Sequence, residues 1–162
     1  MAQAGTEVGY QSSLTIQSDR GGSTVNLFAD SSALAKRYLA DEKSDDFDKL
    51  LEGATSLAVS VLCLPEIISA LCRRRRERFV TAAQYAAVKS ALESDLADTM
   101  IIQMIDDVIL GSIRLLESTP LRASDAIQIS SALVWRADTF VSSDARQCAA
   151  AKANGLEVVR LL

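Results

Sequence analysis

Short apolar runs alternate with longer amphipathic segments along most of the chain. Five apolar runs predict buried strands, at 25–29 ("VNLFA"), 56–60 ("SLAVS"), within 99–105 ("TMIIQMI"), at 139–143 ("TFVSS") and at 156–162 ("LEVVRLL"). The intervening segments predict helices after Ser31 and over 41–53, 64–79, 81–98, 106–119, 123–137 and 144–155. Strands that alternate with helices in this way indicate an α/β fold, with a mostly parallel sheet of about five strands covered by helices on both faces.

Local signals set the predicted ends of several helices. Ser31 and Thr81 stand where a helix N-cap is expected, because a side-chain oxygen there accepts a hydrogen bond from a free backbone N–H. Gly53 and Gly155 stand where helices are expected to stop.

One domain accounts for the length of 162 residues. Residues 1–24 are polar and rich in Gly and Ser, so we expect a flexible extension there and a single domain over 25–162. No apolar run approaches the roughly 20 residues of a membrane span, and the N-terminus lacks the pattern of a signal peptide. Three cysteines at irregular spacings (Cys63, Cys72 and Cys148) indicate reduced thiols, which favours the cytoplasm.

The chain contains no histidine, which excludes a Ser-His-Asp triad, a Cys-His pair and histidine zinc sites. Catalysis must therefore rest on carboxylates, hydroxyls, thiols, lysines or a metal ion. The net charge of −4 argues against nucleic-acid binding through bulk electrostatics, although an acidic site that recruits cations remains compatible with it.

Four acidic residues lie at predicted strand ends or helix starts. They are Asp30, Glu66, Asp125 and Asp144. Taken alone, the position of each acid is explained by the favourable interaction of a carboxylate with the dipole at a helix N-terminus. Together they occupy the positions that face the crevice at the carboxyl edge of a parallel sheet. Carboxylates brought together repel one another, and a divalent cation relieves that repulsion, so an oxygen-only set of this kind suits Mg²⁺ or Mn²⁺.

Four stretches that contain these acids resemble the PIN-domain family of the VapC type, the ribonuclease toxins of bacterial toxin–antitoxin pairs. The stretches read "FADSSALAKRY", "LPEIISAL", "LRASDAIQISSAL" and "FVSSDARQCAAAKANGLEV", and the resemblance extends from about Val25 to the C-terminus. It implies a three-layer α/β/α sandwich and Mg²⁺- or Mn²⁺-dependent endonucleolytic cleavage of RNA by a metal-activated water.

The resemblance also implies roles for individual residues. Asp30, Glu66, Asp125 and Asp144 become the catalytic and metal-binding set, with Ser32 and Ser142 in support. The sequence departs from the family at Gln128, where relatives often carry a histidine, and this position is expected to lie outside the acidic set. A cognate VapB-like antitoxin and a homodimer are the implied partners, with helices 41–53 and 64–98 as the expected contact surfaces.

The segment "CRRRRERF" (72–79) is the main basic run of the chain. It reads equally well as a solvated helix face and as a local binding surface. On the predicted helix Arg73 lies on nearly the same face as Glu66, so Arg73 is a candidate to bind the phosphate of the substrate.

Other functions compatible with the pattern are an RNA-processing PIN nuclease without an antitoxin and a non-catalytic binding module. A phosphatase with an aspartate nucleophile needs a second Asp two residues after the first, where Ser32 stands. A receiver domain needs an acidic pair near the first strand, and "VNLFA" has none. A degenerate PIN scaffold would lack one of the four acids, and all four are present.

Overall fold

A single parallel sheet lies at the centre of the computed structural model, which describes residues 24–38 and 44–161. The strands are β1 (Asn26–Ala29), β2 (Ser56–Ser60), β3 (Met100–Ile102), β4 (Thr139–Ser142) and β5 (Glu157–Arg160). Their order in the sheet is β3-β2-β1-β4-β5, and every neighbouring pair is parallel. All five predicted strands are confirmed.

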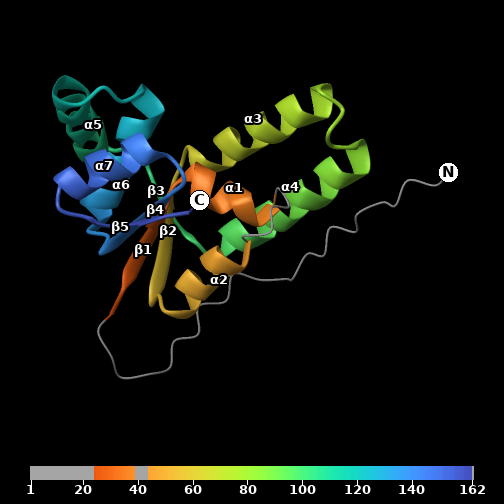
Figure 1. Ribbon diagram of the computed structural model, residues 1–162, viewed down its shortest axis with the longest axis horizontal. Coiled ribbons are helices and arrows are strands. Elements are labelled where there is room, and N and C mark those ends of the chain that lie inside the picture. Colours follow the sequence, from red (N-terminus) through yellow and green to blue (C-terminus); the bar gives the residue numbers. More distant parts are fainter. Residues whose placement is uncertain (1–23, 39–43, 162) are drawn as a thin grey trace.

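Helices cover both faces of this sheet (Figure 1). They are α1 (Ser31–Tyr38), α2 (Ser44–Glu52), α3 (Cys63–Arg76), α4 (Ala82–Ala97), α5 (Asp106–Ser118), α6 (Ala123–Trp135) and α7 (Ala145–Ala153). One apolar core joins the sheet to α1–α4, and a second joins it to α5–α7. The predicted α/β/α sandwich is therefore confirmed.

Alternation along the strands divides these two cores. In β1, Leu27 and Ala29 belong to the core beneath α1–α4, whereas Phe28 belongs to the core beneath α5–α7. Phe28 stacks on Phe140 of β4 with ring centroids 5.9 Å apart and planes within 10°. Because successive strand side chains point to opposite faces, an apolar run such as "NLFA" is what a strand covered on both sides requires.

The helix starts agree with the sequence at Thr81 and differ at Ser31. The Thr81 hydroxyl accepts from the backbone N–H of Gln84 and the Gln84 side chain accepts from the N–H of Thr81, which makes a capping box. The prediction that Ser31 caps α1 is wrong. Asp30 does so, since its Oδ1 accepts from the Ala33 N–H at 2.8 Å.

Several sequence predictions concern the edges of the described region. The proposed extension at 1–24 lies almost wholly outside the described residues, as does the start of the helix expected at 41–53. Over the described ranges, no helix is long and apolar enough to cross a membrane. The three cysteines are free thiols, as predicted, with Cys63 and Cys148 buried.

Helices α5 and α6 approach each other closely at Gly111. A Cβ atom at this position would lie 2.3 Å from Ser130 Oγ, which is far inside van der Waals contact. Ser130 is buried, and its hydroxyl donates to the carbonyl oxygen of Val108 at 2.8 Å. The pair therefore fixes the spacing of α5 over α6.

We predict that Gly111→Ala lowers the free energy of unfolding by about 1–3 kcal/mol, because the added methyl group displaces the Ser130 hydroxyl from a buried hydrogen bond. Urea denaturation measures the change. Gly53→Ala is the control, since a Cβ there meets nothing closer than 3.7 Å. A Gly111→Ala protein as stable as wild type would contradict the tight packing, whereas partial rescue by Ser130→Ala would support it.

Candidate active site

Two of the predicted acids lie at the switch point of the sheet. Asp30 directly follows β1, and Asp144 follows β4, its neighbour in the sheet. The chain builds β2 and β3 on one side of β1 and then β4 and β5 on the other, so the strand order switches between β1 and β4. The backbone N–H of Asp30 donates to the carbonyl of Val141 at 3.0 Å, so pairing of the two strands extends as far as the acid. Ligands of open parallel sheets bind at this point of the carboxyl edge.

Asp30 is the most enclosed of the four acids, with 2% of its surface exposed. Its carboxylate receives only neutral donors from the described residues. The Ser32 hydroxyl lies 2.9 and 3.0 Å from its two oxygens, Ser142 Oγ lies 3.0 Å from Oδ2, and the Ala33 N–H donates to Oδ1. The predicted supporting residues Ser32 and Ser142 thus both contact Asp30.

Burial raises the pKa of Asp30 to about 6 from 3.8. The hydrogen bonds from Ala33, Ser32 and Ser142 lower it in part, while the charge of Glu66 raises it further. A carboxylate held this way loses hydration and gains no positive partner from the described residues. It is therefore poised either to take a proton or to bind a cation.

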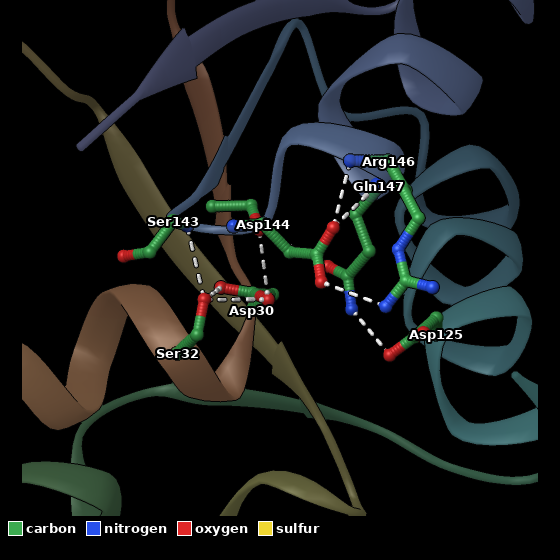
Figure 2. A network of polar contacts seen from close by, with 8 residues as sticks. Asp30, Ser32, Asp125, Ser143, Asp144, Arg146 and Gln147 are labelled. Atoms are coloured by element: carbon green, nitrogen blue, oxygen red, sulfur yellow. Dashed lines mark hydrogen bonds and ion pairs between the residues drawn. The ribbon is translucent and has the colours of Figure 1, made fainter. Parts of the chain in front are cut away.

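Gln147, on α7, joins three of the four acids through polar contacts (Figure 2). Its Nε2 donates to Asp125 Oδ1 at 2.7 Å, and its backbone N–H reaches Asp144 Oδ1 at 3.3 Å. Its Oε1 lies 3.1 Å from Ser142 Oγ, the hydroxyl that also contacts Asp30. Since Ser142 has one proton, it donates to Asp30 or to Gln147 at any one time.

Asp144 is the N-cap of α7. Its Oδ1 accepts from the backbone N–H groups of Arg146 and Gln147, and the Arg146 guanidinium lies 3.6 Å from Oδ2. Although desolvation acts to raise the pKa of Asp144, these N–H groups and the arginine charge hold it below its ordinary value. At a pH at which Asp30 is partly protonated, Asp144 is therefore ionised.

Glu66 lies in the first turn of α3 and is held by two side chains from other elements. Its Oε2 accepts from the Ser31 hydroxyl and from Gln128 Nε2, the latter at 2.8 Å. Gln128 also donates to Ser31 Oγ at 2.6 Å and is 1% exposed. Gln128 is not itself one of the four acids, as the sequence predicted, but its amide directly orients one of them, Glu66.

The structure therefore gathers the four acids at one edge of the sheet, in two linked groups. Asp30, Asp125 and Asp144 connect through Ser142 and Gln147, and Glu66 is held beside Asp30 by Ser31, the next residue along the chain. As the side chains stand, no three Asp, Glu, Cys or His residues of the described region form a cluster suited to a metal ion. Polar side chains occupy the space between the carboxylates.

Sequence reasoning named Gln128 without its contact to Glu66, and it did not single out Gln147. Gln128 lies three residues after Asp125 on α6, and Gln147 lies three residues after Asp144 on α7. Residues at this spacing share a helix face, so an amide one turn after a candidate acid was the available signal. Both are buried, and the Oε1 of Gln128 has no hydrogen-bond partner among the described residues.

Arg73, predicted to bind substrate phosphate, is exposed on α3 two turns after Glu66. None of the ion pairs found among the described residues involves it. The Arg73 guanidinium is thus available to a ligand, on the part of α3 that extends away from the site.

Solved structures with this fold include toxin–antitoxin proteins. VapBC2 of Rickettsia felis, bound to a promoter DNA fragment, matches with a TM-score of 0.63 at 14% identity, over 85% of this chain and 100% of that chain. VapBC-5 of Mycobacterium tuberculosis matches with a TM-score of 0.61 at 18% identity, over 85% and 99%. The same organism's VapC20, described as a toxin that cleaves the sarcin-ricin loop, matches with a TM-score of 0.59 at 17% identity, over 83% and 99%.

The likeness to these proteins is one of fold. Identities of 14–18% do not carry activity from one chain to another, and the matches extend over nearly the whole of each relative. No protein-family model matches this sequence, and no curated protein matches it significantly. The solved structures confirm the PIN-type fold that was expected from the sequence.

The raised pKa of Asp30 predicts a specific pH dependence of stability. The folded state holds this proton more tightly than the unfolded chain, so the contribution of Asp30 to the free energy of unfolding falls as pH rises from about 4 to about 6, by about 3 kcal/mol in full. Asp30→Asn has no titrating carboxyl at this position, so its free energy of unfolding does not fall for this reason. We expect wild type to lose stability relative to Asp30→Asn across that window.

Urea denaturation of both proteins between pH 4 and pH 7, in EDTA, measures the difference. Asp107→Asn is the control, since Asp107 is an exposed acid in the first turn of α5 and forms no ion pair with a described residue. A constant difference between wild type and Asp30→Asn over the whole pH range would show that Asp30 titrates normally.

Proposed function

We propose that this protein is a Mg²⁺- or Mn²⁺-dependent endoribonuclease of the cytoplasm, the toxin of a toxin–antitoxin pair. The observation that carries the proposal is the state of Asp30, a carboxylate buried at the switch point of a parallel sheet with neutral donors around it and the charge of Glu66 nearby. A divalent cation would relieve both costs, and oxygen ligands suit Mg²⁺ and Mn²⁺.

The residues present fit such a cation by their chemistry. Asp30, Glu66, Asp125 and Asp144 supply carboxylate oxygens from four separate elements that meet at one edge. Glu66 Oε1 makes no hydrogen bond with the described residues, while Oε2 is held by Ser31 and Gln128. When bound, the cation would stabilise charge on the phosphodiester and lower the pKa of an attacking water.

The chain's own side chains would orient the reacting groups. Gln147 holds Asp125 by its amide and contacts Ser142, which in turn holds Asp30. Gln128 fixes Glu66 through its amide. Arg73 would contact a phosphate of the bound RNA, because a guanidinium binds phosphate oxygens strongly.

Replacement of Asp30 tests this proposal. Asp30→Asn keeps the size of the side chain and an oxygen to accept from the Ala33 N–H, but it removes the charge. We expect RNA cleavage in Mg²⁺ to fall by about 100-fold or more, the order of loss found when a metal site is damaged. Asp107→Asn should cleave as wild type does.

Two outcomes would contradict the proposal. Equal cleavage by wild type and Asp30→Asn would remove Asp30 from the chemistry. Undiminished cleavage by wild type in EDTA, with activity unaltered on addition of Mg²⁺ or Mn²⁺, would remove the metal dependence.

An antitoxin partner is supported by a groove beside the site as well as by the VapBC structures. The groove has a volume of about 380 Å³ and lies between α3, the end of α4 and the β2–β3 edge. Its lining is mainly apolar and includes Val59, Leu64, Leu96 and Ile101. Such a groove suits the apolar face of an amphipathic helix, as the sequence prediction of an antitoxin contact on 64–98 requires.

A homodimer, also expected from the sequence, is better supported on α5 than on helices 41–53 and 64–98. Helix α5 buries Val108, Ser112 and Leu115 against the rest of the protein. It also exposes a second set of large apolar side chains, Ile109, Leu110, Ile113 and Leu116, preceded by Met104 and Ile105. A helix that is apolar on both sides indicates a further partner for its outer face.

We expect Ile113→Arg to weaken self-association by tenfold or more, because a charge would be buried near the centre of the interface. Ile113 is 45% exposed in the described chain, so the variant should fold normally. Light scattering after size-exclusion chromatography measures the mass as a function of concentration. Lys152→Gln on α7 is the control, because Lys152 is exposed and forms no ion pair among the described residues. A dimer unchanged by Ile113→Arg would place the interface elsewhere.

A further inference from the structure

The last turn of α3 and the connection that follows it form a basic tip, residues 73–79, at the outer end of a helical hairpin. Figure 1 shows α3 and α4 side by side, with this connection at the end away from the sheet. Helix α3 ends in a Schellman motif, in which the Phe79 N–H donates to the Arg74 carbonyl and the Arg78 N–H donates to the Arg75 carbonyl. The tip is therefore an ordered turn.

The tip concentrates positive charge in an acidic protein. It contains five arginines and one glutamate, a charge of +4, while the whole chain has a net charge of −4, so the remaining residues carry −8. All five arginines are exposed, and none forms an ion pair with a carboxylate of the described chain. Arg75 lies over the Tyr85 ring of α4, 5.6 Å from its centroid, and no described carboxylate neutralises the charge of the tip.

Two features distinguish the tip from an ordinary solvent-exposed helix end. Phe79 is 76% exposed, the highest value of any large apolar side chain among the described residues. In a Schellman motif the residue at this position commonly packs back on the last turn of the helix, and Phe79 does not. Arg78 adopts φ +64°, a conformation that favours glycine, so the backbone itself gives no reason for arginine there.

We infer that the basic tip is a second RNA-binding surface, which holds a single-stranded segment outside the acidic site. Arginines at the tip would bind phosphates, and Phe79 would stack on an unpaired base. This inference rests on the proposed function, because the RNA it would hold is that nuclease's substrate.

RNA fits the tip better than an acidic peptide does. An acidic peptide would use the arginines and leave Phe79 in water, whereas a nucleotide offers a phosphate and an aromatic base together. Four consecutive arginines on a helix are also about 100° apart, so those other than Arg75, which lies over Tyr85, face several directions, which suits a flexible strand more than a flat protein surface.

The part of the tip beyond Arg73 is separate from the acids. Arg76 comes ten positions after Glu66 on α3, which is about 15 Å along a helix axis. An RNA dinucleotide bound at the acids cannot reach the outer end of the tip, whereas a longer strand can. The tip would therefore add affinity for long RNA and leave the chemical step unchanged.

The test measures RNA binding in an Asp30→Asn background, where chemistry cannot intervene. The probe is a fluorescein-labelled oligouridylate longer than α3, followed by fluorescence anisotropy at several salt concentrations. We expect Arg78→Gly and Phe79→Ala each to weaken binding by roughly fivefold to tenfold, with a shallower salt dependence only for Arg78→Gly. A dinucleotide competitor should bind all these proteins equally.

Arg136→Gly is the matched control. Arg136 is also exposed, ends helix α6 and adopts φ +60°, so the same substitution has the same effects on backbone and net charge away from the tip. Its RNA binding should equal that of the parent. Both glycine variants should be at least as heat-stable as the parent, because they remove a left-handed arginine.

Several results would overturn the inference. Oligouridylate binding unchanged in both tip variants would do so, as would an equal loss in Arg136→Gly, which would mean that net charge alone governs binding. Loss of affinity for a poly-glutamate peptide with RNA binding intact would assign the tip to an acidic protein partner. Wild-type cleavage is assayed separately, so an inactive wild type with tip-dependent RNA binding would reject the proposed function and retain the tip.

Discussion

The site depends on one constraint, the burial of the Asp30 carboxylate at the end of the central strand. Strand β1 lies between β2 and β4, so its last residue is enclosed by both layers of helices. Asp30 caps α1, accepts from Ser142 and pairs with β4 through its backbone. A charge in this position needs compensation, and the described residues provide it only through neutral donors. The energetic cost that remains raises the pKa of Asp30, and it is the cost that the proposed cation would relieve.

Amide side chains explain how several acids can share this edge. Gln128 and Gln147 each place N–H groups against a carboxylate while they add no charge. An arginine or lysine in these positions would form a buried salt bridge and satisfy the acid permanently. An amide orients the carboxylate and leaves its charge uncompensated, so the electrostatic attraction for a cation is retained. Arg146 is the exception, and it lies at the exposed rim beside Asp144.

The sequence was sufficient to predict most of the fold, because hydrophobic periodicity and helix-capping residues report local structure. The five strands and the Thr81 cap follow from apolar runs and capping chemistry that act within a few residues. Contacts between elements were less accessible. Ser31 reads as a cap in sequence, yet its hydroxyl is used by Glu66, 35 residues away, and the cap passes to Asp30. The place of Gln128 within the acidic group likewise depends on how α6 packs against α1 and α3, which no local pattern encodes.

Under the proposed function, the distribution of charge would separate RNA binding from RNA cleavage. Carboxylates at the sheet edge would repel RNA until a cation is bound, so affinity would have to come from elsewhere. Arginines at the end of α3 would supply it at a distance where they cannot neutralise the acids. If they lay beside Asp30, they would form ion pairs there and lower its attraction for a cation. Helix α3 carries Glu66 in its first turn and arginines in its last, so a single rigid element would set the spacing between the site of chemistry and the site of RNA attachment.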